Sequence, residues 1–320
     1  MKRIVLILVT ALSLMAADKP FPQGVYDEVI LADARSARES AKAMVISLEK
    51  GSMEKQAFER LAMDWKRVQA LYIAGEIDEA YADTPREIDI YHNAKEDITA
   101  QLDRIVVSKE EVGKEMFKNS FKTINALEYL LNKKGVNVQR ERAMALIAAR
   151  NLEEKFSTIV QVYEKERKKL LNDESRFNAL VMNQLIASSY ELKEWRVGEP
   201  SGLAKKYKGS RDIRRADLYR SGLSLKALQV IVETHKRVMD ASGYVDFGDY
   251  AIKAGADSEV VIVRRALASA LKNIQTMNTD LFAPASKGLY SDLGRLHNGY
   301  YISLIGALKM TSKILDADGD

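Results

Sequence analysis

A glutamate on an otherwise apolar helical stripe is the residue of this chain best suited to chemistry. Within 109–132, spacings of four, three, four and three residues place Glu128 on one face with apolar residues: Phe117, Phe121, Ile124 and Leu131. Asn125 lies three residues earlier and points to nearly the same side. Because burying an unpaired carboxylate is costly, Glu128 is expected to be paired, protonated or bound to a cation. This predicts either a ligand or metal site between helices, or a structural glutamate paired with an Arg or Lys of another helix.

A second group of charged side chains lies in the segment 205–221. Its basic run, interrupted by one acidic residue, Asp212, consists of Lys205, Lys206, Lys208, Arg211, Arg214 and Arg215, and Asp217, Tyr219, Arg220 and Ser221 follow it. Arg215 is a suitable partner for a buried carboxylate, because its planar fork can bond both oxygens. The segment is therefore expected either to face Glu128 or to form a solvated basic loop.

The composition excludes several other kinds of metal site and nucleophile. The chain has no Cys, which excludes disulfides, thiolate nucleophiles, Cys-ligated zinc and iron–sulfur clusters. It has three histidines, His92, His235 and His297, and none has a second His at a ligand spacing. Any metal site would therefore depend on carboxylates, amides and scattered histidines.

Length and charge restrict the class of protein further. The 320 residues are 47% hydrophobic and 29% charged, an ordinary globular balance, and the length favours two domains. The net charge is +4, and Lys2 and Arg3 contribute two of these positive charges. A nucleic-acid partner is not expected, because the remaining charge is nearly balanced and the basic segment is short.

The elements that must position these residues are expected to be helices. Apolar residues recur every three or four positions, and we find no alternating pattern with hairpin turns. The expected helices cover residues 24–50, 54–74, 86–104, 109–132, 138–171, 173–196, 223–241, 257–281 and 287–315. They predict an all-α fold of two antiparallel helical bundles packed together. We place the boundary near Asn172–Asp173, with an N-terminal bundle over 18–172 and a C-terminal bundle over 173–320.

The first residues are typical of an export signal. Lys2 and Arg3 precede an apolar run from Ile4 to Met15, and small residues follow. The run is shorter than the roughly 20 apolar residues that span a bilayer, so we expect residues 1–17 to be a signal peptide. No later segment is long and apolar enough to predict a membrane span in the mature chain. Periplasmic localisation is expected, with a secreted protein as the alternative. Lipid attachment is not expected, because it needs an N-terminal Cys.

Several stretches resemble the imelysin-like family, which includes imelysin peptidases and iron-regulated protein A-like periplasmic proteins. The segment from Phe121 to Leu131 is similar to the family signature G-x-H-x-x-E, which is followed by apolar residues. Further similar stretches lie at 64–68, 85–91, 198–224 and 296–315, so the resemblance extends over most of the mature chain.

The resemblance implies an all-helical, two-bundle envelope protein from a family with members classed as metallopeptidases and others linked to iron acquisition. The signature residues map onto Thr123, Asn125 and Glu128, so an Asn stands where the family has its His. Because an Asn amide is a weaker transition-metal ligand than imidazole, this change argues against zinc-peptidase chemistry. In the second half, the segment 205–221 resembles the family segment that carries an acidic residue and a Ser before the next helix, which match Asp217 and Ser221.

Together these observations predict a periplasmic imelysin-like binding or accessory protein in iron or other metal acquisition. Its site is expected between the bundles, formed by Asn125, Glu128, Arg215, Asp217 and Ser221. The ligand would be a small molecule or a metal ion, either iron or another divalent metal, with Glu128 as the metal ligand, and an envelope protein is a possible partner. The alternatives are a metallopeptidase that uses Glu128, or a non-catalytic envelope scaffold.

Overall fold

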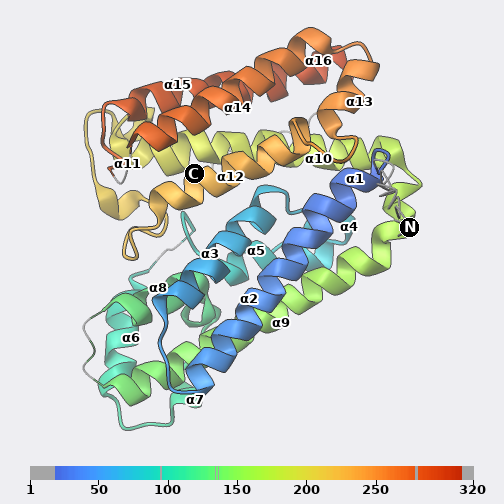
Figure 1. Ribbon diagram of the computed structural model, residues 1–320. Coiled ribbons are helices and arrows are strands. Elements are labelled where there is room, and N and C mark those ends of the chain that lie inside the picture. Colours follow the sequence, from blue (N-terminus) through green and yellow to red (C-terminus); the bar gives the residue numbers. More distant parts are fainter. Residues whose placement is uncertain (1–18, 94–95, 134, 136, 278–279, 312–320) are drawn as a thin grey trace, which may run out of the picture.

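Helices make up nearly all of the regular structure in the computed structural model, which describes residues 19–93, 96–133, 135, 137–277 and 280–311. Within these residues no β-strand forms, and one isolated bridge joins Lys19 to Tyr244. The all-α prediction is therefore confirmed. Figure 1 shows two helical bundles packed together, with α1 to α9 in one and α10 to α16 in the other.

Long helices form the frame of the first bundle. Its first helix runs from α1 (Gln23–Val25) through the π-helical segment η1 (Tyr26–Leu31) into α2 (Ala32–Glu49). α2 packs along α3 (Lys55–Ala70) and α9 (Val138–Leu171). In their core, the rings of Trp65 and Phe156 lie 5.9 Å apart and both are fully buried. Since burying a side chain such as Phe156 contributes about 1.5–3 kcal/mol, the apolar faces hold these helices together.

The second bundle begins with α10 (Glu174–Glu191), which is capped by Asp173 through the N–H of Arg176 at 3.0 Å. This helix continues as the π-helical η4 (Leu192–Gly198) and α11 (Glu199–Ser201). Two 3-10 turns, η5 (Lys205–Tyr207) and η6 (Ile213–Arg215), then lead into the remaining helices: α12 (Ser224–Met239), α13 (Phe247–Lys253), α14 (Asp257–Met277), α15 (Ala285–Asn298), η7 (Gly299–Leu304) and α16 (Ile305–Ala307). α14 packs against both α12 and α15.

α12 joins the two bundles, because it packs against α3 of the first bundle as well as α14 of the second (Figure 1). At this junction Arg237 of α12 donates to both carboxylate oxygens of Asp33 on α2, at 2.8 and 2.9 Å. The contact between bundles therefore contains charged groups as well as apolar ones.

The prediction of a single helix over 86–104 is wrong. The chain forms α5 (Thr84–Ile88) and α6 (Ile98–Val107), with a non-helical turn between them. Asp89 ends the first helix with its side chain, which accepts the backbone N–H two residues later at 2.9 Å. Asp97 begins the second as its N-cap. Carboxylates that bond nearby N–H groups compete with a continuing helix, and apolar periodicity does not detect them.

The prediction of a single helix over 109–132 is also wrong, and the break in this helix affects the candidate site. The segment divides into α7 (Val112–Glu115), the 3-10 turn η3 (Asn119–Lys122) and α8 (Ile124–Asn132). Phe117, expected on the buried stripe, is 69% exposed. Thr123 starts the helix anew, because its hydroxyl accepts the N–H of Ala126 at 3.3 Å. Glu128 therefore lies on a short helix of its own.

The other predicted helices differ mainly at their ends. The third helix stops at Ala70 and is followed by the short α4 (Ala74–Ile77) and η2 (Glu79–Tyr81). None of the described helices combines the length and apolar character that a membrane span requires. The export signal at 1–17 lies outside the described residues. The domain boundary near Asn172 falls between α9 and α10 and stays a prediction.

Candidate ligand-binding site between the bundles

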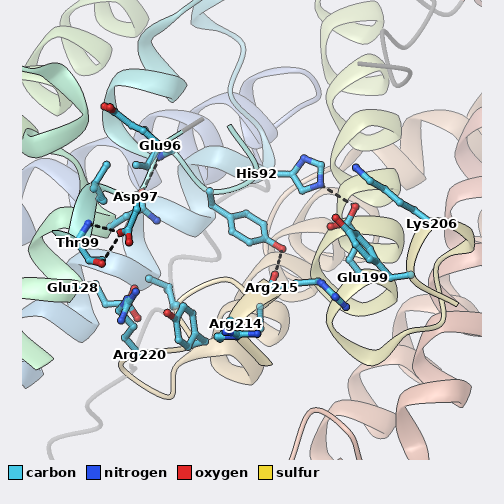
Figure 2. Close-up of a pocket in the computed structure, with 18 residues that line it drawn as sticks. His92, Glu96, Asp97, Thr99, Glu128, Glu199, Lys206, Arg214, Arg215 and Arg220 are labelled. Atoms are coloured by element: carbon cyan, nitrogen blue, oxygen red, sulfur yellow. Dashed lines mark hydrogen bonds and ion pairs between the residues drawn. The ribbon is translucent and has the colours of Figure 1, made fainter. Parts of the chain in front are cut away.

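A pocket of about 450 Å³ lies where the two bundles meet, and both bundles form its wall. The first bundle contributes the turn between α5 and α6 together with α8, and the second contributes Glu199 and the segment 206–220. Figure 2 shows Glu96, Asp97 and Thr99 on one side of this pocket and Glu199, Lys206 and Arg215 on the other. Of the predicted site residues, Asn125, Glu128 and Arg215 line the pocket.

Glu128 lies on α8 just beyond the Thr123 cap and is only 3% exposed. Its Oε1 accepts two hydrogen bonds from Ser221 of the second bundle, from the backbone N–H at 2.8 Å and from the hydroxyl at 2.7 Å. Its Oε2 has no hydrogen-bond partner among the described residues. The expected pairing of Glu128 across the bundles is thus made by a serine, and not by Arg215.

The environment of Glu128 disfavours its charge. Burial raises the pKa of its carboxyl above the usual value of 4.5, and the nearby carboxylate of Asp217 acts in the same direction. The hydrogen bonds from Ser221 and the charge of Arg220 oppose this shift only in part. Such a carboxyl can change protonation state when a ligand arrives, which is a common property of functional sites.

Asn125 lines the pocket and bonds to the backbone of a neighbouring turn. Its side-chain oxygen accepts the backbone N–H of Ile90 at 2.8 Å, which fixes the start of the turn between α5 and α6. Its amide group lies in the pocket lining, and no hydrogen bond between Asn125 and Glu128 is present. The amide oxygen is therefore occupied by the backbone, which leaves the NH₂ group as its donor toward a ligand.

Asp217 does not line the pocket but lies in a buried charged cluster behind it. Its Oδ2 is 2.6 Å from Lys66 Nζ and 3.3 Å from Arg196 Nε, and all three side chains are almost fully buried. The same Lys66 Nζ is 2.6 Å from Asp89 Oδ2. Burial alone would raise the pKa of Asp89, but Lys66 holds it below its usual range. The cluster connects α3 to the segment that carries Ser221. Asp217 therefore helps to hold that segment, and with it Ser221, beside the first bundle.

Arg215 points away from Glu128. Its guanidinium donates to the Ser210 carbonyl oxygen at 2.8 Å and lies 4.0 Å from the ring centroid of Tyr207. Its own carbonyl oxygen accepts the hydroxyl of Tyr91 at 3.1 Å, which joins the segment to the first bundle. Arg215 is thus a wall residue held by its own loop.

His92 is a pocket residue that sequence reasoning did not select. It stacks on Trp195 of η4 with ring centroids 4.0 Å apart and planes 8° apart, and its Nε2 is 3.0 Å from a carboxylate oxygen of Glu199. Its φ of 64° is a left-handed conformation that is uncommon outside glycine. No helical periodicity marked it, because it lies in the turn where a continuous helix was expected.

Lys66 and Arg220 were also missed. Lys66 lies beside Trp65 on the buried face of α3 and is 0% exposed, so the argument that selected Glu128 would have found it. Arg220 makes cation–π contacts with Tyr219 and Tyr129, at 4.8 and 5.1 Å from their ring centroids. Nothing in the sequence distinguished it from the other cations of its loop.

The carboxylates and histidines of the described chain are dispersed. No group of three or more His, Asp or Glu side chains within the described residues is arranged to hold a metal ion. Of the other predicted site residues, Ser221 is the one that bonds to Glu128, the expected metal ligand. A metal at this position would need ligands from outside the protein, such as the oxygens of a chelator.

Two solved structures share this fold. An imelysin-like protein from Psychrobacter arcticum 273-4 matches with a TM-score of 0.72 and 13% identity, covering 91% of this chain and 95% of that chain. A protein described as an iron-regulated protein A precursor, from Parabacteroides distasonis ATCC 8503, matches with a TM-score of 0.60 and 12% identity, covering 92% and 96%. A search of curated proteins found no match.

A match over most of the sequence identifies the family of this chain. A family model for imelysin matches residues 25–295, which include α8, Glu128 and the loop that carries Ser221. The matched span also begins near the start of α1 and ends within α15, so it extends over both bundles. The chain therefore belongs to the imelysin family.

Proposed function

We propose that this chain is an exported, periplasmic binding or accessory protein that takes a ligand between its two bundles, in the acquisition of iron or another metal. One observation carries the proposal. Glu128 is buried at the pocket between the bundles, is held from the opposite bundle by Ser221, and keeps one carboxylate oxygen without a partner in the part of the chain that the structure describes. A buried acceptor left open in a pocket of this size is a feature of ligand sites.

Family and neighbours support the link to iron. The chain belongs to the imelysin family, and the structural neighbour from Parabacteroides distasonis has the name of an iron-regulated protein. The basic, then apolar N-terminal segment supports export. A fusion of residues 1–30 to alkaline phosphatase is expected to give periplasmic enzyme activity, and a cytoplasmic, inactive fusion would contradict export.

A peptidase is the less favoured alternative. Asn125 replaces the signature His, and its oxygen is already bonded to the N–H of Ile90. A hydrolytic metal usually needs three protein ligands, commonly including His. We therefore assign Glu128 to ligand binding and not to activation of water.

The test compares two equally buried glutamates. Glu128 and Glu141 are 3% and 2% exposed, but Glu141 lies outside the pocket and near Lys133, at 3.6 Å. Wild type, Glu128→Gln and Glu141→Gln would be incubated with ferrous iron, ferric citrate, zinc or manganese, and bound metal measured by elemental analysis after gel filtration.

We expect iron to stay with wild type and Glu141→Gln and to be reduced about tenfold or more in Glu128→Gln, since a hydrogen bond or ion pair to a charged group contributes about 1.5–3 kcal/mol. Absence of metal from all three proteins would overturn the proposal. Metal-dependent cleavage of a peptide pool that is abolished by Glu128→Gln would instead establish the peptidase alternative.

A further inference from the structure

The basic segment 206–220 forms one wall of the pocket, and three cations of that wall have no carboxylate partner among the described residues. We propose that this wall selects an anionic ligand, a small polycarboxylate that also carries a hydroxyl group, bound free or as a metal chelate. The inference rests on the proposed function and names the ligand class for the same site.

The bonding of the cations supports this. Lys206 Nζ lies 5.4 Å from the ring centroid of Tyr207, and Arg220 lies over Tyr219 and Tyr129. Within the described part of the chain, neither has a hydrogen bond or an ion pair. Arg215 bonds only to the backbone and hydroxyl of Ser210.

One cation of the wall is different. Arg214 is fully engaged by Asp212, with its guanidinium 2.8 Å from the carboxylate. The wall therefore holds three cations free to meet an anion, at Lys206, Arg215 and Arg220.

The acidic residues of the pocket each make a polar contact, and Glu128 is the most deeply buried of them. Glu96 is 3.0 Å from Lys118, Asp97 caps α6, and Glu199 contacts His92. Among the described residues, Oε2 of Glu128 is a buried acceptor that remains open. The bonding capacity left for a ligand thus includes the cations on the wall and the buried acceptor of Glu128.

The positions of the cations indicate more than one anionic group. Lys206 and Arg215 share the ring of Tyr207, whereas Arg220 lies on a different pair of rings. Stacking on an aromatic ring restricts a guanidinium while leaving its edge free to bond a carboxylate. A ligand with two or more separated carboxylates can contact both places, which a single phosphate group cannot.

The open acceptor specifies the remaining part of the ligand. Oε2 of Glu128 would accept a hydrogen bond from a ligand hydroxyl, which a simple dicarboxylate lacks. Hydroxy-polycarboxylates also chelate hard cations through their oxygens, so the same ligand class can carry iron without a protein metal cluster. The pocket volume of 450 Å³ is in the usual range of about 300–1,000 Å³ for small-molecule sites.

The test is isothermal titration of the purified protein with four probes: citrate, ferric citrate, ferrous ion alone and inorganic phosphate. The variants are Arg220→Gln and Lys206→Gln, with Arg60→Gln as the control, because Arg60 is an exposed arginine on α3 outside the pocket lining. We expect citrate to bind wild type and Arg60→Gln equally, and each pocket variant to bind it about tenfold more weakly. Added salt should weaken binding, since the contacts are charged.

Three results would overturn the inference: citrate affinity unchanged in both pocket variants, phosphate binding as tightly as citrate, or no binding of citrate in either form. If citrate does not bind, while ferrous ion alone binds and is lost in the Glu128→Gln variant of the metal test, the inference fails and the proposed function stands. If citrate binds and is weakened by the pocket variants, but ferric citrate and ferrous ion do not bind, the ligand class holds and the link to iron fails.

Discussion

The hydrogen bonds between Ser221 and Glu128 give the sharpest test of the site, because they join the two bundles through one carboxylate oxygen. Ser221→Ala removes the hydroxyl at 2.7 Å and leaves the backbone N–H at 2.8 Å in place. A hydrogen bond to a charged acceptor contributes about 1.5–3 kcal/mol, and one to a neutral acceptor about 0.5–1.5 kcal/mol. Ser221→Ala should therefore lower the free energy of unfolding by about 1.5–3 kcal/mol when Glu128 is ionised.

A double-mutant cycle with Glu128→Gln separates this hydrogen bond from other effects of the alanine. Urea unfolding at pH 8 should show that Ser221→Ala costs about 1 kcal/mol more in the wild-type background than in Glu128→Gln. At pH 5 the difference should shrink, because burial raises the pKa of Glu128 and its carboxyl is protonated more readily. Thermal unfolding should show a loss of about 2–5 °C for the single variant. A cost below about 0.5 kcal/mol in both backgrounds at pH 8 would refute the geometry described for this pair.

Further predictions concern the buried charges. Because the pKa of Glu128 is raised in the folded state, folding favours the protonated form, and the contribution of this group to stability falls as pH rises above about 4.5. Glu128→Gln should therefore make the free energy of unfolding depend less on pH. Identical pH profiles for wild type and variant would contradict this. Lys66→Met leaves Asp89 and Asp217 without their shared cation, and urea unfolding should show a loss of about 3–5 kcal/mol, whereas a loss under 1 kcal/mol would be inconsistent with the cluster. Burial lowers the pKa of His235 to about 3, so its imidazole resonances should not shift between pH 8 and pH 5, and a midpoint near 6.5 would show that it is not buried. Since its pKa is lower in the folded state, any stability that depends on it is lost as pH falls below about 6.5.

Apolar periodicity identified the candidate glutamate but described its helix wrongly. The stripe argument placed Glu128 on a buried face, and it is 3% exposed. The same argument put Phe117 on that face, although it is 69% exposed. The error arises because Thr123 caps α8 with its side chain, and a hydrogen bond of one hydroxyl leaves no trace in the spacing of apolar residues.

Residue types alone did not predict which side chains pair with the buried carboxylates of the site. Arginine was chemically reasonable for a buried carboxylate, yet Arg215 bonds Ser210 and the two hydrogen bonds to Glu128 come from Ser221. Lys66 and Arg196, the cations that neutralise Asp217, lie far from it in the sequence. Pairings of this kind depend on distances of a few ångströms between elements, which spacing along the chain does not specify.

The sequence by itself determined the helical class, the helix Val138–Leu171, the family signature and the unusual carboxylate within it, because helical periodicity and residue type act over a few neighbouring residues. The tertiary structure decided where the helices break, which residue holds Glu128 and where the basic segment lies. In the sequence that segment was either a loop in solvent or a wall facing Glu128. In the fold it lies against the α5–α6 turn and α8 as the cationic wall of a pocket. Only packing the two bundles together brings such distant charges within bonding distance, and burial there is what changes the energy of each charge.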